Sequence, residues 1–112
     1  MDGLLNLIQF AIRGKRLSIG NEKRLQNELE EAFTLHNINF IREVYLDKNN
    51  IVDFMIEGLA IEVKIMNGSS SMQIYRQLER YSNFPEVKAL MLMTAFWHFS
   101  RIIFCKLQHY LL

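Results

Sequence analysis

The sequence predicts one α/β (α+β) domain in which a mixed sheet is flanked by helices, and two observations favour this class. Apart from a short N-terminal stretch, apolar residues recur with a helical period in two segments and with strand-like patterns in four others. Their order along the chain is helix, three strands, helix, strand, which is typical of helices packed on a single sheet. The helical segments are 21–37 and 72–84, and the strand segments are 38–46, 51–56, 59–66 and 87–94.

Length and composition predict one compact domain that spans residues 1–112. Half of the 112 residues are hydrophobic and 22% are charged, which is ordinary for a globular protein. We expect the core at about residues 20–94, with a peripheral N-terminal helix and a peripheral C-terminal segment. The formal charge of +1 means that any contact with nucleic acid needs a local basic face. A single cysteine, Cys105, excludes an internal disulfide and predicts a cytoplasmic location.

Neither apolar end of the chain predicts a membrane segment. The N-terminal stretch LLNLIQFAI has a helical pattern, but it is short, follows Asp2 and lacks a small-residue cleavage site, so we expect no signal peptide. The longer stretch VKALMLMTAFWHFSRIIF is interrupted by Lys88, His98 and Arg101, so we expect no membrane span. The tail beyond residue 94 is compatible with a short helix, with another strand at 102–107, or with both.

The two long helices have recognisable ends. Asn21 can cap the first, whose apolar face carries Leu25, Leu29, Ala32, Phe33 and His36. At 100° per residue Glu22 falls on that same apolar face, where an acidic residue is unusual. The second helix follows the polar segment NGSSS, which supplies a break and caps, and it ends before Pro85.

The stretch IVDFMIEGLAIEVK (51–64) predicts a hairpin that carries three charges among apolar residues. Glu57 and Gly58 form its two-residue turn. On the second strand Glu62 and Lys64 share one face, because they are two residues apart, and the apolar residues take the core face. Asp53 lies on the adjacent antiparallel strand, so we expect the charges to form a metal-binding rim at an edge of the sheet.

These residue types suit metal-assisted hydrolysis of a phosphodiester. The carboxylates of Asp53 and Glu62, with water and a backbone carbonyl such as that of Val63, are hard oxygen ligands suited to Mg²⁺ or Mn²⁺. Lys64 can orient or help to deprotonate a water and offset the charge of a phosphate. A Glu-x-Lys pair on a strand is also commonly a solvated surface pair, and the spacing alone leaves that alternative open.

The pattern D-x(8)-E-x-K, here Asp53, Glu62 and Lys64, resembles the PD-(D/E)XK phosphodiesterase superfamily, which has the restriction-endonuclease-like fold. Val52 stands where that superfamily usually has proline. The resemblance implies that Asp53 and Glu62 bind Mg²⁺ or Mn²⁺ and that these residues and Lys64 activate water. Many members add a glutamate from the first core helix, for which Glu22 is the first choice and Glu28 the second.

The segment QLERY, Gln77 to Tyr81, resembles the Q-x-x-x-Y motif of members related to the nuclease domains of bacterial recombination helicases. The resemblance covers roughly residues 20–94 and is greatest to small stand-alone nuclease-like proteins of bacteria and phages. It implies a Mg²⁺-dependent deoxyribonuclease, with Gln77 and Tyr81 supporting the site or the substrate. Endonuclease action is favoured because the chain is too small to enclose a strand. The alternatives are an inactive nuclease-fold DNA-binding or assembly module, and an interaction protein with a structural hairpin.

Other residues are candidates for contact with DNA, which we expect as the partner more than RNA. Arg76 and Arg80 are four apart on the second helix, and Lys15 and Arg16 precede the first. Ser70 adjoins the Glu-x-Lys strand and could contact a phosphate. Solvated surface is the alternative for each of these. The three histidines lack zinc-site spacing, and the aromatic residues of the tail suggest core packing or else a homodimer interface: His36, His98, His109, Phe96, Trp97, Phe99 and Tyr110.

Overall fold

The computed structural model describes residues 2–18, 20–65, 71–95 and 100–105. Three helices and five strands lie in these ranges. Their bounds are α1 (Asp2–Ile12), α2 (Glu22–Leu35), β1 (Ile41–Asp47), β2 (Asn50–Ile56), β3 (Leu59–Ile65), α3 (Ser71–Ser82), β4 (Ala89–Ala95) and β5 (Ser100–Cys105). The order from α2 to β4 is the αβββαβ core that the sequence predicts.

The strands form one mixed sheet in the order β1-β2-β3-β4-β5. Strands β3 and β4 are parallel and are joined through α3, whereas the other neighbouring strands are antiparallel. The predicted α+β class with a mixed sheet is therefore confirmed, and the open question of the tail resolves as a strand at Ser100–Cys105. The prediction of charges at a sheet edge is wrong, because β3 is the middle strand of the sheet.

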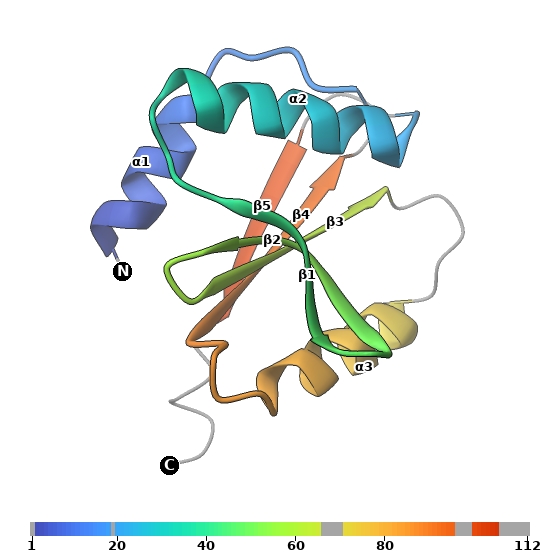
Figure 1. Cartoon of the computed structure of the whole chain (residues 1–112). Helices are drawn as coiled ribbons and strands as arrows, with labels where there is room; N and C mark the ends of the chain where they lie inside the picture. Colours follow the sequence, from blue (N-terminus) through green and yellow to red (C-terminus); the bar gives the residue numbers. More distant parts are fainter. Residues whose placement is uncertain (1, 19, 66–70, 96–99, 106–112) are drawn as a thin grey trace.

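The helices cover the two faces of the sheet (Figure 1): α1 and α2 lie on one face and α3 lies on the other. Alternate side chains of β3 and β4 pack with α1 and α2 in a large apolar cluster that includes Ile8, Leu29, Ile61 and Met91. A smaller cluster on the α3 face contains Val52, Ala60, Tyr81, Val87 and Leu90. As predicted, β4 is buried on both faces, since the exposure of Leu90, Met91 and Leu92 is 8% or less.

Local sequence explains the ends of the elements that frame the site. Asn21 caps α2, because its side chain accepts a hydrogen bond from the Arg24 amide at 3.0 Å. In the turn between β2 and β3, Glu57 and Gly58 have φ of 48° and 86°, the positive values that a two-residue hairpin turn requires. A β-carbon at Gly58 would also lie 2.6 Å from the Lys88 side chain. Both the positive φ and this close contact therefore favour glycine at position 58.

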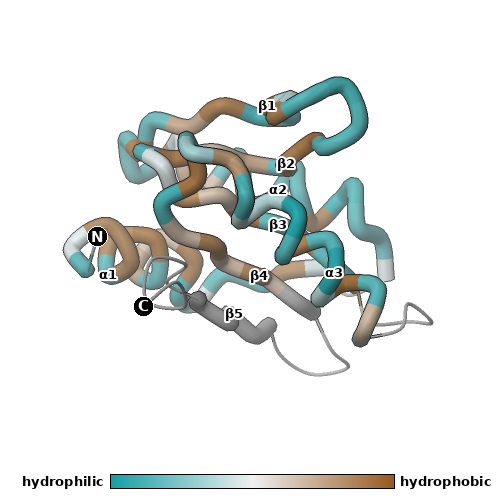
Figure 2. The backbone as a smooth tube through the Cα atoms, turned by 90° about the horizontal axis from the view of Figure 1, so that it is seen from below, coloured by the Kyte–Doolittle hydropathy of each residue, from teal (hydrophilic) through white to brown (hydrophobic). Residues whose placement is uncertain are grey.

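Hydropathy follows these layers (Figure 2): β4 is hydrophobic, whereas the turn between β1 and β2 is hydrophilic. None of the helices in the described ranges is both long and apolar enough to cross a membrane.

Candidate functional site

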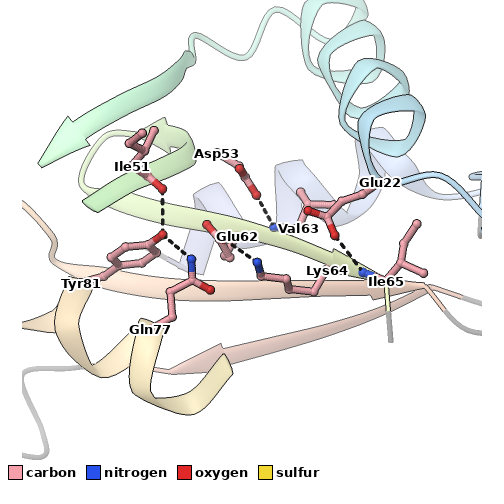
Figure 3. Close-up of polar contacts among 9 residues, drawn as sticks. All are labelled: Glu22, Ile51, Asp53, Glu62, Val63, Lys64, Ile65, Gln77 and Tyr81. Atoms are coloured by element: carbon pink, nitrogen blue, oxygen red, sulfur yellow. Dashed lines mark hydrogen bonds and ion pairs between the residues drawn. The ribbon is translucent and has the colours of Figure 1, made fainter. Parts of the chain in front are cut away.

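Strand β2 leaves β3 at Asp53, and this separation creates the site. The two strands pair at Ile56–Leu59, Met55–Ala60 and Phe54–Ile61, a register that would next place Asp53 opposite Glu62 and then Val52 opposite Val63. Instead, the Val63 amide donates to Oδ2 of Asp53 at 2.7 Å (Figure 3). The Asp53 carboxylate thus occupies the place of a backbone acceptor. Because N–H and C=O of one strand residue point to the same side, the Val63 carbonyl faces this gap as well.

Glu62 is a buried acid beside the gap. It is 3% exposed, and its Oε2 lies 3.4 Å from Nζ of Lys64. Its other oxygen, Oε1, is buried and has no hydrogen-bond partner among the described residues. Burial, reinforced by the negative charge of Asp53, raises the pKa of Glu62 to about 8. The interpretation of Glu62 and Lys64 as a solvated surface pair is therefore wrong.

Asp53, like Glu62, has a raised pKa. Burial raises the pKa of Asp53 most, and the nearby Glu22 carboxylate raises it further, while the hydrogen bond from the Val63 amide and the charges of Lys64 and Arg42 lower it. The hydrogen bond from Val63 thus holds Asp53 against the strand that carries Glu62, and the charge of Asp53 acts on Glu62. Because the charged forms of both carboxyl groups are disfavoured, binding of a cation between them would be favourable.

Helix α2 adds Glu22 to the same side of β3. Oε2 of Glu22 accepts a hydrogen bond from the Ile65 amide at 3.4 Å. Ile65 lies two residues after Val63, whose amide donates to Asp53, so both amides point to the same side of β3. Glu28, the second choice from sequence, is engaged elsewhere: its two carboxylate oxygens accept from the amide and the hydroxyl of Ser18 at 2.7 and 2.8 Å. The structure thus places Glu22, and not Glu28, beside the carboxylates of the hairpin.

Helix α3 contributes Gln77 and Tyr81, which the sequence singled out. Tyr81 is 1% exposed and its hydroxyl donates to the Ile51 carbonyl at 2.7 Å, while Nε2 of Gln77 donates to that hydroxyl at 2.8 Å. Burial, followed by the negative charge of Glu62, raises the pKa of Tyr81 well above its usual value. The pair therefore fastens α3 to β2 two residues before Asp53 (Figure 3).

Arg42 on β1 supports the site and was not predicted from the sequence. Its guanidinium donates to Gln26 at 2.8 Å and to Asn27 at 3.0 Å, and it lies 5.3 Å from the centroid of the Phe54 ring. These contacts join the first half of α2, which carries Glu22, to the β1–β2 hairpin. An arginine in a strand pattern gives no local signal of such a role, because its partners lie on a distant helix.

The predicted contacts with DNA are less closely tied to the site. Arg76 and Arg80 are exposed on α3, and Nε of Arg80 donates to Asn50 in the β1–β2 turn at 3.3 Å. Lys15 and Arg16 lie between α1 and α2, and no hydrogen bond or ion pair in the described part of the chain joins them to the acidic residues. Ser70 lies outside the described residues.

The histidines and tail aromatics are the remaining predicted features. His36 caps the C-terminal end of α2 and packs edge-on against Phe10, with ring centroids 5.5 Å apart. This contact gives His36 a structural role, which fits its place on the apolar face of the helix. Beyond it, the other members of the group fall outside the described residues: His98, His109, Phe96, Trp97, Phe99 and Tyr110.

The residues present fit a hard divalent cation by their chemistry. Carboxylate oxygens of Asp53 and Glu62 and the Val63 carbonyl are the oxygen donors that Mg²⁺ and Mn²⁺ prefer. Oε1 of Glu62, which has no partner among the residues that the structure describes, is a buried group that a cation would satisfy. Within residues 2–18, 20–65, 71–95 and 100–105, no three Asp, Glu, His or Cys side chains converge to hold an ion by themselves. A cation here would therefore rely on two side chains, a backbone oxygen and water.

A scan against models of protein families, a search of curated proteins and a search of solved structures each found no match for this chain. The inference of function therefore rests on the geometry of the site and on the sequence motif.

Proposed function

We propose that this protein is a nuclease that hydrolyses DNA phosphodiester bonds with the help of Mg²⁺ or Mn²⁺. The observation that carries the proposal is the buried Glu62, whose Oε1 has no hydrogen-bond partner in the described part of the chain and whose charged form is disfavoured by burial and by the adjacent Asp53. A buried, unsatisfied carboxylate is costly unless a cation completes it. The resemblance of Asp53, Glu62 and Lys64 to the PD-(D/E)XK pattern supports the same chemistry and a restriction-endonuclease-like fold.

Each residue of the site has a role in this proposal. Asp53, Glu62 and the Val63 carbonyl would hold the cation, with Glu22 of α2 bound beside them to the Ile65 amide of β3. The cation supplies charge neutralisation at the phosphate and a more acidic water. Lys64 keeps its ammonium next to Glu62 with its side chain 23% exposed, so it can reach both the site and a bound phosphate.

The remaining residues act on the framework and the substrate. Gln77 and Tyr81 hold β2 against α3, which keeps Asp53 beside β3. Exposed Arg76 and Arg80 lie on the same helix and can bind the phosphate backbone. We assign Lys15, Arg16 and Ser70 to the same task. Endonucleolytic cleavage in the cytoplasm and a homodimeric assembly belong to the same proposal.

Cleavage of a supercoiled plasmid tests the proposal. With Mg²⁺ or Mn²⁺ we expect the wild type to nick the plasmid, and Lys64→Ala to lower the rate by about 10²–10⁴-fold, the range for removal of a general acid–base group. Asp53→Ala should also abolish nicking. Lys48→Ala, in the exposed turn between β1 and β2, is the matched control and should nick at the wild-type rate. Equal nicking by all four proteins would reveal a contaminant and refute the proposal.

The second candidate function is a nuclease-fold module that binds DNA or assembles with other proteins without cleaving. It is favoured by one observation: in the described part of the chain no three potential ligand side chains converge on a metal position. For this function we expect a gel shift of DNA that is independent of Mg²⁺, no nicking under any metal, and no change in the shift with Asp53→Ala. Metal-dependent nicking lost with Asp53→Ala would reject it.

A further inference from the structure

The β1–β2 hairpin changes the face it presents part way along its length. Near its base, Arg42 bonds to residues of α2 and the Phe54 ring packs on Phe33 of α2, with centroids 5.3 Å apart. Toward its tip, Leu46 and Val52 pack in the α3 cluster on the other face of the sheet. Side chains an even number of residues apart should share one face of a strand. The hairpin therefore turns over between these positions, and its end reaches α3 (Figure 1).

Glu43 lies at the point where the hairpin turns over. Its φ is 53°, in the left-handed region that strand residues other than glycine avoid. Arg42 pairs with Phe54 and Val44 pairs with Val52, but Glu43 and Asp53, which face each other in the same register, are not paired. The interruption in β1 is thus directly opposite the residue at which β2 leaves β3.

The Glu43 side chain does not explain this conformation. It is exposed, and it forms no hydrogen bond or ion pair with the described residues. A left-handed residue without glycine costs free energy, and such strain tends to occur where the local geometry serves a site. The backbone conformation itself is therefore the feature to explain.

We propose that the left-handed backbone at Glu43 positions Asp53. By breaking the β1–β2 ladder, it lets β2 rotate so that the Asp53 carboxylate reaches the Val63 amide at 2.7 Å. The same rotation directs the Ile51 carbonyl to the Tyr81 hydroxyl at 2.7 Å. Glu43 is a positioning residue that acts through β2. Its effect on metal binding rests on the proposed function, but its effect on the Asp53–Val63 hydrogen bond does not.

Two substitutions at Glu43 test this inference, read out by hydrogen exchange of the Val63 amide and by Mn²⁺ titration of the full chain. Glu43→Gly suits the left-handed region, so Val63 exchange and Mn²⁺ affinity should stay within about twofold of wild type while the melting temperature rises. Glu43→Val favours a regular strand, so Val63 exchange should accelerate and Mn²⁺ affinity should weaken, each by about tenfold. Equal Val63 exchange in the two variants would overturn the inference.

Ile41 provides the matched control, because it is exposed on the same strand and pairs regularly with Met55. There the order should reverse: Ile41→Gly should lower the melting temperature, and neither Ile41→Gly nor Ile41→Val should change Val63 exchange or Mn²⁺ affinity. If Glu43→Val does not fold, a failure of Glu43→Gly to raise the melting temperature would still overturn the inference. A wild type that binds no Mn²⁺, with Val63 exchange as expected, would contradict the proposed function alone.

Discussion

The two faces of β3 differ in chemistry: one is entirely apolar and the other carries charged residues. The face toward α1 and α2 carries Leu59, Ile61, Val63 and Ile65, all in the large apolar cluster. The face toward α3 carries Ala60 in the smaller cluster, followed by Glu62 and Lys64. Burial of each large aliphatic side chain on the first face stabilises the fold by about 1.5–3 kcal/mol. On the second face burial raises the pKa of Glu62 and so opposes its charge.

The comparison shows how so small a domain can hold a costly site. A buried carboxylate beside another carboxylate destabilises the charged form of the metal-free protein. The apolar face of the same strand offsets that cost, since both faces share one backbone. We therefore expect substitutions of the apolar residues on the first face to reduce stability, and neutral substitution of Glu62 on the second face to reduce function while increasing stability.

The largest effect should come from the apolar face. Ile61→Ala removes a fully buried side chain from the main cluster, so the free energy of unfolding should fall by about 2–5 kcal/mol. Urea unfolding followed by circular dichroism measures the change, and Ile61→Val should cost only about 0.5–1.5 kcal/mol. A loss below 0.5 kcal/mol for Ile61→Ala, taken as the rough threshold of an exposed site, would show that this face is not the stabilising one.

An intermediate effect of opposite sign is expected from the charged face. The pKa of Glu62 is raised from 4.5 to about 8, so between these pH values the folded state holds a proton that the unfolded state has released. Stability of the metal-free protein should therefore fall as pH rises from about 4.5 to about 8. Glu62→Gln should flatten this slope and raise stability at pH 8 by about 1–3 kcal/mol.

Urea unfolding at several pH values, in the presence of a chelator, measures the slope. Mg²⁺ should stabilise the wild type, increasingly so as pH rises and Glu62 ionises, and should stabilise Glu62→Gln less. An identical pH slope in the two proteins would remove Glu62 from the electrostatic cost of the site.

The smallest effect should come from the hydrogen bonds between α3 and β2. Tyr81→Phe removes the hydroxyl that joins Gln77 to the Ile51 carbonyl, and should cost about 1 kcal/mol. Tyr75→Phe, on the same helix but 61% exposed, is the control and should be neutral. Thermal unfolding compares the two, and an equal effect at both positions would show that the buried hydroxyl contributes nothing.

The parts of this molecule that could be predicted from sequence are those that local chemistry decides. Alternation identified the apolar face of β3, Asn21 marked the start of α2, and Glu57-Gly58 fixed the turn that brings Asp53 near Glu62. Helical geometry placed Glu22 on the apolar face, and the structure finds Glu22 bonded to β3 while Glu28 bonds to Ser18.

The features that sequence could not give depend on partners distant in the chain. Strand β3 is central because β4 pairs beside it and β5 pairs beside β4, and no local sequence pattern encodes these pairings. The contacts of Arg42 lie 12 to 16 residues away on α2. A glutamate in a strand pattern does not signal a φ of 53°. The β1–β2 hairpin packs against α2 near its base and against α3 near its tip, and these distant contacts decide the conformation at Glu43.

The bend at Glu43 has a further consequence for the outer edge of the sheet. Strand β1 occupies that edge, and Ile41 and Tyr45 are exposed there at 65% and 66%. A flat edge strand with apolar side chains is a template on which another chain can add a strand and aggregate. Because the left-handed residue Glu43 interrupts the pairing of β1, the edge is not flat and offers only short regular segments on either side, which makes it a poor template.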